Sequence, residues 1–545
     1  MNSSDVPPST PVLVGVGQVA ESPDAAGYRG LSAVELAAEA ARRALADTRG
    51  DNHGVLTGLT AAIDTVAGVR QFENSIPGTK APLGRSNNFP RSVAARLGAT
   101  PRTAILEVSG GQGPQHLVTE LAATIERGES EVALIVGAEA LSTARHFAGS
   151  PDRPDFTEHI EGQLDDRGFG LDGVVSLEVV KHGLTSAVSH YALCEHARRS
   201  RLGLSRADYA RTMGVLFAPF TMIAAGNPYA AAPTARDAAE LTTVSERNRM
   251  IADPYPRYLC ARELVNQSAA VVMMSSRAAD RLGVPQDRRV YLHGHADVHE
   301  RQLLDRPDLG SAPATALAMA EALTMAGVGV DELNTLDLYS CFPIAVSTVV
   351  DALGLRPDDP RGLTVTGGLP FFGGPGNNYS MHAIAQTALR ARAQPGSYGL
   401  VGANGGLLSK YSVGVYSTTP APLPPSRNTA LQAEIAGWPV VPRSTQPEGW
   451  ATVETYTVES FAATYTGTPG RARSHGVVVG RLESTRERFV ASVDDSDSGL
   501  LGFLSESDPL GMRLYVHSFD FGNRVARTEE QMGELIAGRS DRRTG

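Results

Sequence analysis

A strand, a Gly-rich turn and a helix follow one another near residue 110 and could hold reactive chemistry. Residues 104–108 form a largely apolar run typical of a buried strand, and Ser109 to Gly113 form the turn. Pro114 suits the first helical position, and apolar spacing continues to Gly128. Free N–H groups at a helix start can stabilise the oxyanion that forms when a thioester carbonyl is attacked. An ordinary strand-to-helix turn would show the same pattern.

A serine nucleophile is one possibility at this turn. Ser109 could be activated by His116 or His382, which would make an acyl-serine enzyme. The Gly-x-Ser-x-Gly elbow that often presents such a serine is absent. The acyl-serine hypothesis therefore stays one alternative among several.

Two other patterns resemble cofactor sites but lack the surroundings that such sites need. His293 and His295 would share one face of a strand, yet the rest of a metal-ligand pattern is missing, so we expect a polar strand end and no metal. Residues 15–20 match the dinucleotide fingerprint Gly-x-Gly-x-x-Ala. A loop over residues 21–30 follows where that fingerprint needs a helix, so we expect no nicotinamide cofactor.

Composition narrows the class of protein. The 545 residues, 42% hydrophobic and 20% charged, suffice for several globular domains. A net charge of −10 argues against broad nucleic-acid or anionic-membrane binding. Three cysteines without a CxxC pair argue against a zinc or disulfide scaffold and fit a reducing compartment. We expect a cytoplasmic protein, because residues 1–10 are no signal peptide and no apolar run could span a membrane.

The elements that must position the turn occur in two similar sets. Ser32 and Glu35 form a capping box before a helix, and residues 132–141 follow the turn and its helix as a buried strand. A second Gly-rich turn near residue 374, a helix and a strand near residue 400 repeat this order at nearly the same spacing. The repeat predicts two similar α/β halves that face one another.

The remaining segments differ in character. Residues 145–250 are richer in charge, contain helical runs such as 205–217, and indicate an insertion packed over a site. Residues 420–447 are rich in proline and predict a linker with a short helix near 430–436. Residues 448–527 hold short β-like runs typical of a small all-β barrel, and few aromatics interleave its arginines, so we expect no nucleic-acid binding. Residues 528–545 predict a solvated helix and tail.

From residue 11 to 419 the sequence resembles the thiolase superfamily, especially thiolase-like proteins near the sterol-carrier-protein thiolases. Several motifs carry the resemblance, and they occur in the order typical of the family. These are the nucleophile turn at 108–115, the following strand at 133–141, the helix and strand at 326–342 that lead into the NEAF or HDCF block, the Gly-rich block at 367–375 and the Cys-x-Gly block at 402–406.

The resemblance implies a fold and a ligand. It implies a duplicated five-layer αβαβα core with an N-terminal half at 11–289, which carries the insertion, and a C-terminal half at 290–419. It implies a coenzyme A thioester as substrate or ligand, with no permanently bound cofactor. The last domain looks like an oligonucleotide-binding (OB) type barrel. The family is usually oligomeric, so a homodimer and a monomer both stay open.

The expected catalytic residues of the family are missing. The acyl-accepting cysteine falls at or near Ser109, the Gly-His-Pro histidine falls at Gly374, and the second cysteine falls at Ala403. Tyr339 stands first in the NEAF-type block. An alanine cannot move a proton, so ordinary thiolase turnover is not expected.

Four other residues are candidates for the missing roles. His382 could replace the histidine, or be a satisfied buried side chain, and Asn404 could bind an oxyanion, or cap a turn. Cys341 is the cysteine in a motif block, although it could simply fill a small buried space. Tyr339 resembles the tyrosine of retro-aldolases that act on β-hydroxyacyl-CoA, or it packs at a strand end.

Three functions therefore compete. The first is an acetyl-CoA acetyltransferase-like acyltransferase of lipid metabolism with a rearranged site. The second is a retro-aldolase that cleaves a carbon–carbon bond in a β-hydroxyacyl-CoA. The third is a non-catalytic protein that binds a CoA ligand or a partner.

Overall fold

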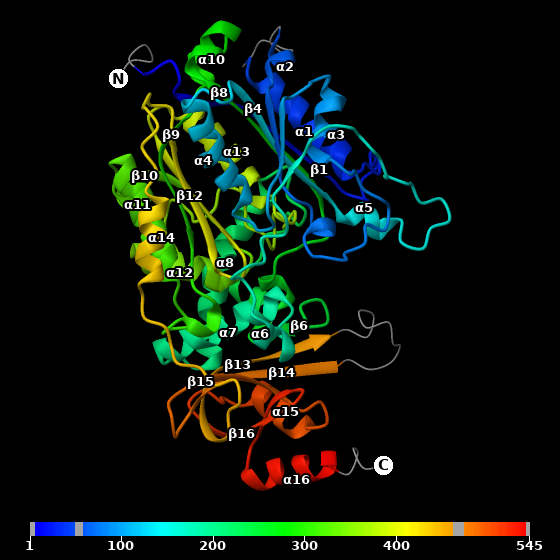
Figure 1. The fold of residues 1–545 in the computed structure, drawn as a ribbon, viewed down its shortest axis with the longest axis vertical. Helices are drawn as coiled ribbons and strands as arrows, with labels where there is room; N and C mark the ends of the chain where they lie inside the picture. The colour runs from blue at the N-terminus through cyan, green and yellow to red at the C-terminus, as the bar shows by residue number, and fades with distance from the viewer. Residues whose placement is uncertain (1–5, 50–57, 462–472, 541–545) are drawn as a thin grey trace.

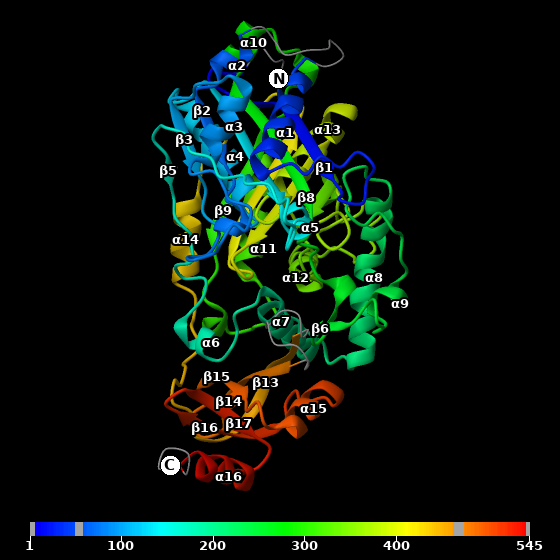
Figure 2. The same ribbon diagram turned by 90° about the vertical axis from the view of Figure 1, so that its right-hand side faces the viewer.

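The computed structural model describes residues 6–49, 58–461 and 473–540. The core stacks two β-sheets with helices between them and on both outer faces (Figures 1 and 2). This arrangement confirms the five-layer αβαβα prediction. Two predictions fall partly outside the described residues. Residues 1–5 belong to the N-terminal segment in which we expect no signal peptide, and residues 541–545 belong to the predicted tail.

The first sheet belongs to the N-terminal half and has six strands in the order β1-β8-β4-β2-β3-β5. Its strands are β1 (Pro11–Glu21), β2 (Thr65–Gly68), β3 (Thr103–Leu106), β4 (Val132–Ala140), β5 (Asp165–Asp166) and β8 (Asn266–Ser275). Strands β2, β3 and β4 run parallel, whereas β8 pairs antiparallel with β1 and β4. The Gly-rich turn at residues 109–113 follows β3, so it lies where the parallel strands end.

The second sheet belongs to the C-terminal half and has the order β10-β11-β12-β9. Its strands are β9 (Tyr291–His299), β10 (Leu333–Leu338), β11 (Tyr398–Gly405) and β12 (Lys410–Ser417). The parallel pair β10 and β11 repeats the arrangement of the first half. Both strands end at motif blocks that the sequence singles out.

Helices form the other three layers. Two central helices lie between the sheets, α4 (Gly113–Glu126) and α13 (Tyr379–Ala393), and both contact strands of each sheet. The outer layer of the first sheet contains α1 (Ala33–Asp47), α2 (Leu59–Ala62), α3 (Phe89–Leu97) and α10 (Ser276–Leu282), and α5 (Leu141–His146) follows the end of β4. The outer layer of the second contains α11 (Pro313–Ala326), α12 (Pro343–Leu353) and α14 (Asn428–Ala436).

Local sequence signals set several of these elements. The predicted capping box is present at α1, where Ser32 accepts from the Glu35 backbone and the Glu35 side chain accepts in return. Proline occupies the first turn of α4, as expected. The helix predicted near 430–436 is α14, which packs against β9 and α11, so this part of the predicted linker belongs to the core.

The insertion is mainly helical. It contains α6 (Leu177–Lys181), α7 (Ala187–Leu202), α8 (Arg206–Ala225), α9 (Ala238–Thr242) and the short strands β6 (Met250–Ala252) and β7 (Tyr255–Pro256). The helix expected over 205–217 continues to Ala225. Figure 1 shows α6 and α7 between the core and the C-terminal domain.

The C-terminal domain is a closed five-stranded barrel. Its elements are β13 (Gly449–Phe461), β14 (Arg473–Leu482), β15 (Arg488–Val493), α15 (Ser498–Glu506), β16 (Arg513–Phe519), β17 (Gly522–Ala526) and α16 (Glu529–Ser540). The strands close as β13-β14-β15-β17-β16-β13, and β15 and β17 run parallel. The barrel is confirmed, but the all-β prediction missed α15, which begins after an Asp497 cap and buries Leu500 and Leu504.

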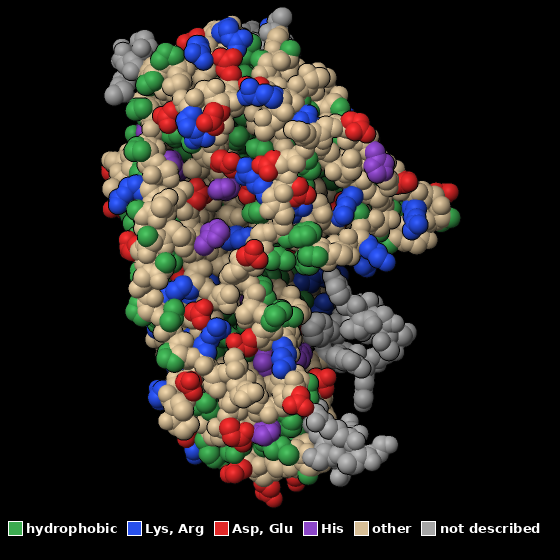
Figure 3. All heavy atoms as spheres, in the orientation of Figure 1, with side chains coloured by type: hydrophobic (Ala, Val, Ile, Leu, Met, Phe, Trp, Pro, Cys, Tyr) green, Lys and Arg blue, Asp and Glu red, His purple; other side chains and the backbone are tan. Residues whose placement is uncertain are grey.

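The outer surface is mixed in charge. On the face in Figure 3, acidic and basic side chains are interspersed over both the core and the barrel. Within residues 6–49, 58–461 and 473–540, no helix combines the length and apolar character needed to cross a membrane.

Candidate functional site

The two halves meet at the start of α4. The Gly110 backbone N–H donates to Asn377 Oδ1 at 2.9 Å, and Ser380 Oγ donates to the Gly111 carbonyl at 2.6 Å. Asn377 and Ser380 lie around the start of α13, so the central helices hold each other's N-terminal turns. A side chain at Gly111 would overlap the Tyr339 phenol. The space in front of α4 is therefore filled by a tyrosine of the other half.

Tyr339 is held at the end of β10. Its backbone N–H donates to the Gly402 carbonyl at 3.0 Å, and its ring packs edge-on against Tyr379 with centroids 5.5 Å apart. The residue keeps 9% of its surface exposed. Burial, followed by the charges of Cys341 and Glu263, raises the pKa of the Tyr339 phenol well above its usual value. The phenol therefore stays protonated at neutral pH and can donate a hydrogen bond.

Tyr191 of the insertion joins two of the predicted site residues. Its Oη accepts hydrogen bonds from Asn404 Nδ2 at 3.1 Å and from the Leu408 backbone at 3.3 Å, and the same hydroxyl lowers the pKa of the Cys341 thiol against the larger effect of burial. Burial raises the pKa of Cys341 to about 12, so the thiol is protonated at neutral pH. No sequence motif singles out Tyr191, because it lies in α7 outside every motif block.

Asn404 retains an unused acceptor in this cluster. Its Oδ1 is buried and has no hydrogen-bond partner among the described residues. Such an orphan atom costs free energy unless a ligand or water bonds it. Tyr339, Cys341 and Asn404 are thus brought together with the start of α4, and the cluster has hydrogen-bonding capacity left for a ligand.

Ser109 lies at the same turn, but its hydroxyl faces elsewhere. Ser109 Oγ donates to the Ser75 carbonyl at 3.1 Å, and its backbone N–H donates to the Phe169 carbonyl at 3.3 Å. Its only hydroxyl proton is used in that bond, and no bond to a histidine is found within the described part of the chain. The arrangement lacks the serine–base contact that an acyl-serine enzyme needs.

His382 lies in the core of the central layer. It is fully buried, its Nδ1 bonds Gln18 Oε1 at 2.8 Å, and its ring packs edge-on against Phe372 at 5.0 Å. Burial lowers its pKa to about 3, so the ring is neutral. Ring contacts through Phe372 and Tyr379 connect His382 to Tyr339, whereas His382 Nε2 is buried and has no hydrogen-bond partner among the described residues.

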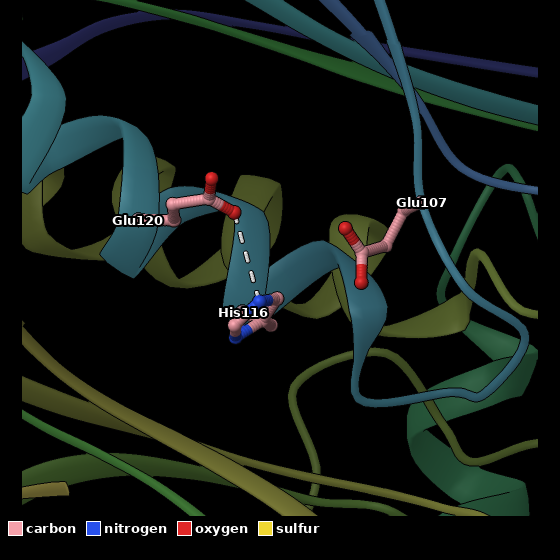
Figure 4. A group of neighbouring side chains, drawn as sticks. All are labelled: Glu107, His116 and Glu120. Atoms are coloured by element: carbon pink, nitrogen blue, oxygen red, sulfur yellow. Dashed lines mark ion pairs between the residues drawn. The ribbon is translucent and has the colours of Figure 1, made fainter. Parts of the chain in front are cut away.

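His116 belongs to a charged cluster at the edge of the interface between the halves. Figure 4 shows His116 and Glu120 on α4 near Glu107, which follows β3. These three are arranged as a metal could bind them. However, Arg167 already bonds Glu107 and Glu120 at 2.6 Å each, and His116 pairs with Asp297 at 3.3 Å. The cluster is therefore an ion-pair network.

The histidines of β9 are also engaged. His293 Nε2 bonds the Thr419 carbonyl at 2.8 Å, and His295 Nε2 bonds the Pro424 carbonyl at 3.1 Å. Both rings secure the segment that follows β12. Each histidine of the His-x-His pattern thus has a backbone partner for its Nε2.

Glu263 is a further candidate that the sequence motifs missed. Its segment lies against two motif blocks, because Ala261 N–H donates to the Cys341 carbonyl at 2.9 Å and Gly374 N–H donates to the Arg262 carbonyl at 2.8 Å. The Glu263 side chain is exposed to solvent, yet its charge raises the pKa of Tyr339. The sequence signal that could have identified Glu263 is its place as a charged residue directly before the apolar run of β8.

Comparisons with known proteins agree with this architecture. Residues 430–520 match the family model "Thiolase-like protein type 1 additional C-terminal domain". The crystal structure of a monomeric SCP2-thiolase-like protein type 1 from Mycobacterium smegmatis is 45% identical, covering 96% of this chain and 100% of that chain with a TM-score of 0.80.

More distant relatives match less of the chain. The beta-ketothiolase BktB of Cupriavidus necator is 32% identical over 112 residues, which are 20% of this chain and 26% of that enzyme's length. The structure of the Ltp2-ChsH2(DUF35) aldolase has a TM-score of 0.55 at 19% identity and covers 75% of this chain and 98% of that chain. The latter likeness concerns the fold.

Proposed function

This chain belongs to the SCP2-thiolase-like proteins of type 1, within the thiolase superfamily, and we propose that it binds an acyl-CoA thioester at the Tyr339 cluster without forming an acyl-enzyme. The whole proposal depends on one observation. The Tyr339 phenol fills the space that a side chain at Gly111, at the start of α4, would need.

Covalent acyl transfer lacks an acceptor in this site. Ser109 donates its hydroxyl proton to a backbone carbonyl, and burial keeps Cys341 as a thiol. Ala403 stands at the position of the family's second cysteine, and this buried alanine cannot move a proton. Acyltransferase activity of the usual kind is therefore not the function that we favour.

Non-covalent recognition of a thioester has suitable groups. The protonated Tyr339 phenol can donate to a thioester carbonyl oxygen, and the amide of Asn404 has an unused buried oxygen. The positive end of α4 adds to the stabilisation of negative charge on that oxygen. Removing one such donor typically costs roughly 3–4 kcal/mol of transition-state stabilisation where a reaction occurs.

We further propose that the chain acts as a monomer with an OB-type barrel. The Mycobacterium smegmatis relative is described as monomeric, and the five-stranded barrel with a helix between its third and fourth strands supports the OB-type proposal. A cytoplasmic location is the expectation that fits three free cysteines.

Calorimetric titration with CoA, acetyl-CoA and acetoacetyl-CoA, followed by hydrogen exchange, tests the binding proposal. We expect saturable binding, with ligand-dependent protection at residues 109–113, 339–342 and 402–406 and none in β14. Protection confined to the barrel, or the absence of binding, would contradict the proposal.

Carbon–carbon cleavage is the second candidate, and the position of Tyr339 favours it. A neutral phenol at a helix start can stabilise a thioester enolate, which is the species formed when a β-hydroxyacyl-CoA is cleaved. A protein of the same fold, the Ltp2-ChsH2(DUF35) aldolase, is named for that class of activity. Release of an aldehyde from a β-hydroxyacyl-CoA by wild type, but not by Tyr339→Phe, is the expected result.

A further inference from the structure

A pocket of about 220 Å³ lies in the N-terminal half of the molecule. The start of α1, the loop after β2 and the end of β4 contribute to its lining, and no residue of the Tyr339 cluster does. Its volume is below the roughly 300–1,000 Å³ of pockets for drug-sized ligands, so it suits a small molecule. The lining combines apolar side chains such as Phe89 and Phe156 with the carboxylates of Glu73 and Glu139.

Glu139 brings a buried carboxylate with an unused oxygen to this pocket. The residue keeps 2% of its surface exposed, and its Oε1 accepts a hydrogen bond from the Phe72 backbone N–H at 2.8 Å. Within the described part of the chain, Oε2 has no hydrogen-bond partner and Glu139 forms no ion pair. A buried carboxylate is costly unless it is paired, so Oε2 needs a donor that the chain does not supply.

Glu73 brings a second carboxylate without a partner. It directly follows Phe72, whose N–H bonds Glu139, so both carboxylates enter the pocket from neighbouring positions. Among the described residues, the Glu73 side chain takes part in no hydrogen bond or ion pair. Arg85, which also lines the pocket, donates to the Glu73 backbone carbonyl at 2.8 Å. Burial raises the pKa of the Glu73 carboxyl to about 7, although the charge of Arg85 opposes this shift.

The other charged groups of the lining do not change this balance. Asp166 is a third acidic residue of the pocket, but it is already paired with Arg70. No third histidine, cysteine or carboxylate of the described residues joins Glu73 and Glu139 within the range that a metal ion needs. The pocket therefore offers negative charge to an organic cation rather than to a metal.

We propose that this pocket binds a small primary amine, whose ammonium group bonds Glu139 beside Glu73 and whose alkyl chain lies against Phe89 and Phe156. An ammonium group has three N–H donors and a positive charge, and its hydrogen bonds to carboxylates are of the strong, charge-assisted kind. The site is independent of the proposed acyl-CoA function, because it shares no lining residue with the Tyr339 cluster.

Calorimetric titration of the full-length protein with butylammonium chloride and with 1-butanol tests this proposal. The two probes have the same alkyl chain, and a hydroxyl replaces the ammonium group in the second. We expect saturable binding of butylammonium and at least about tenfold weaker binding of 1-butanol, because only the ammonium forms charge-assisted bonds.

Variants locate the bound amine. Glu139→Gln keeps an oxygen for the Phe72 N–H but removes the charge, so we expect about tenfold weaker binding of butylammonium or more. Glu73→Gln removes a charge that bonds nothing within the described chain, so it tests the site without disturbing the fold and should weaken binding at least about threefold. Glu246→Gln, at an exposed glutamate of the insertion, is the matched control and should bind like wild type.

Three results would overturn the proposal. Equal affinity for butylammonium in wild type, Glu73→Gln and Glu139→Gln would place the amine elsewhere. Binding of 1-butanol as tight as that of butylammonium would exclude recognition of the charge. The absence of saturable butylammonium binding by wild type would exclude the amine site, whereas titration with CoA thioesters tests the proposed function separately.

Discussion

Single residues decide what chemistry this site can perform. Tyr339 is the residue at which the sequence and the structure agree most closely, because the motif block identified it and the fold brings its phenol to the start of α4. Ser109 and His382 lie in the expected elements, yet Ser109 Oγ is bonded to Ser75 and His382 Nδ1 is bonded to Gln18. Which way a side chain turns depends on neighbours far along the chain, so motif position alone could not predict it.

Gly111→Cys tests whether a thiol fits at the start of α4. Because its Cβ would overlap Tyr339, we expect a loss of roughly 1–3 kcal/mol in the free energy of unfolding, as for an overpacked core. Chemical denaturation measures the loss. The double variant Gly111→Cys/Tyr339→Asn should lose less than the sum of its single changes, and strict additivity would show that the two positions do not collide.

His116 makes stability depend on pH. Burial disfavours its charge, but the bond to Asp297 and nearby carboxylates outweigh burial and raise its pKa to about 9. Because the pKa is higher in the folded than in the unfolded state, protonation of His116 stabilises the fold. This contribution is fully present below the unfolded pKa of about 6.5 and is lost as the pH rises through 9. The side chain is 36% exposed, so we expect roughly 1 kcal/mol after screening. Denaturation from pH 6 to 10 should show this slope in wild type and in His159→Gln, an exposed control, but not in His116→Gln.

At the scale of elements, the repeated strand–turn–helix pattern could be predicted from the sequence, because each copy has its own Gly-rich turn followed by a helix and a strand. The central helices α4 and α13 occupy the equivalent places that the repeat implied. The insertion was recognised only as a helical segment over a site. That α7 would carry Tyr191 to Asn404 and Cys341 could not be predicted, because no periodicity or spacing encodes a contact between such distant segments.

Tyr191→Phe tests this link between the insertion and the core. Removing Oη leaves the Asn404 amide and the Leu408 N–H buried without a partner, so we expect a loss of about 1–3 kcal/mol in the free energy of unfolding. The matched change Tyr398→Phe, at a half-buried tyrosine of β11, should cost much less. Equal losses in the two variants would mean that the Tyr191 bonds add nothing to stability.

At the scale of the whole molecule, the barrel is not an appendage on a flexible linker. Strand β6 of the insertion pairs with β13, and Asp253 N–H donates to the Val458 carbonyl at 3.0 Å. Arg488 of the barrel is fully buried and donates to the Leu304 carbonyl at 2.9 Å and the Pro307 carbonyl at 3.2 Å. The sequence predicted the barrel itself, but its docking depends on long-range register that local patterns do not contain.

Arg488→Met therefore should weaken the whole protein rather than the barrel alone. The change leaves buried carbonyls without their donor and removes one of the two arginines that pair with Glu454, so we expect a loss of roughly 2–4 kcal/mol. Calorimetry should show one transition in wild type, shifted to lower temperature in the variant. A separate barrel transition in wild type would contradict the docked arrangement, and Arg486→Met, at an exposed turn, serves as the control.

The central claim is that a thioester is bound here while every side chain stays unacylated. Intact-protein mass spectrometry after incubation with a saturating concentration of acetyl-CoA, with binding verified by calorimetry on the same sample, tests it most directly. We predict bound ligand and an unchanged protein mass after denaturation. An added acetyl group that maps to Ser109 or Cys341, and that disappears in the matching alanine variant, would contradict the claim.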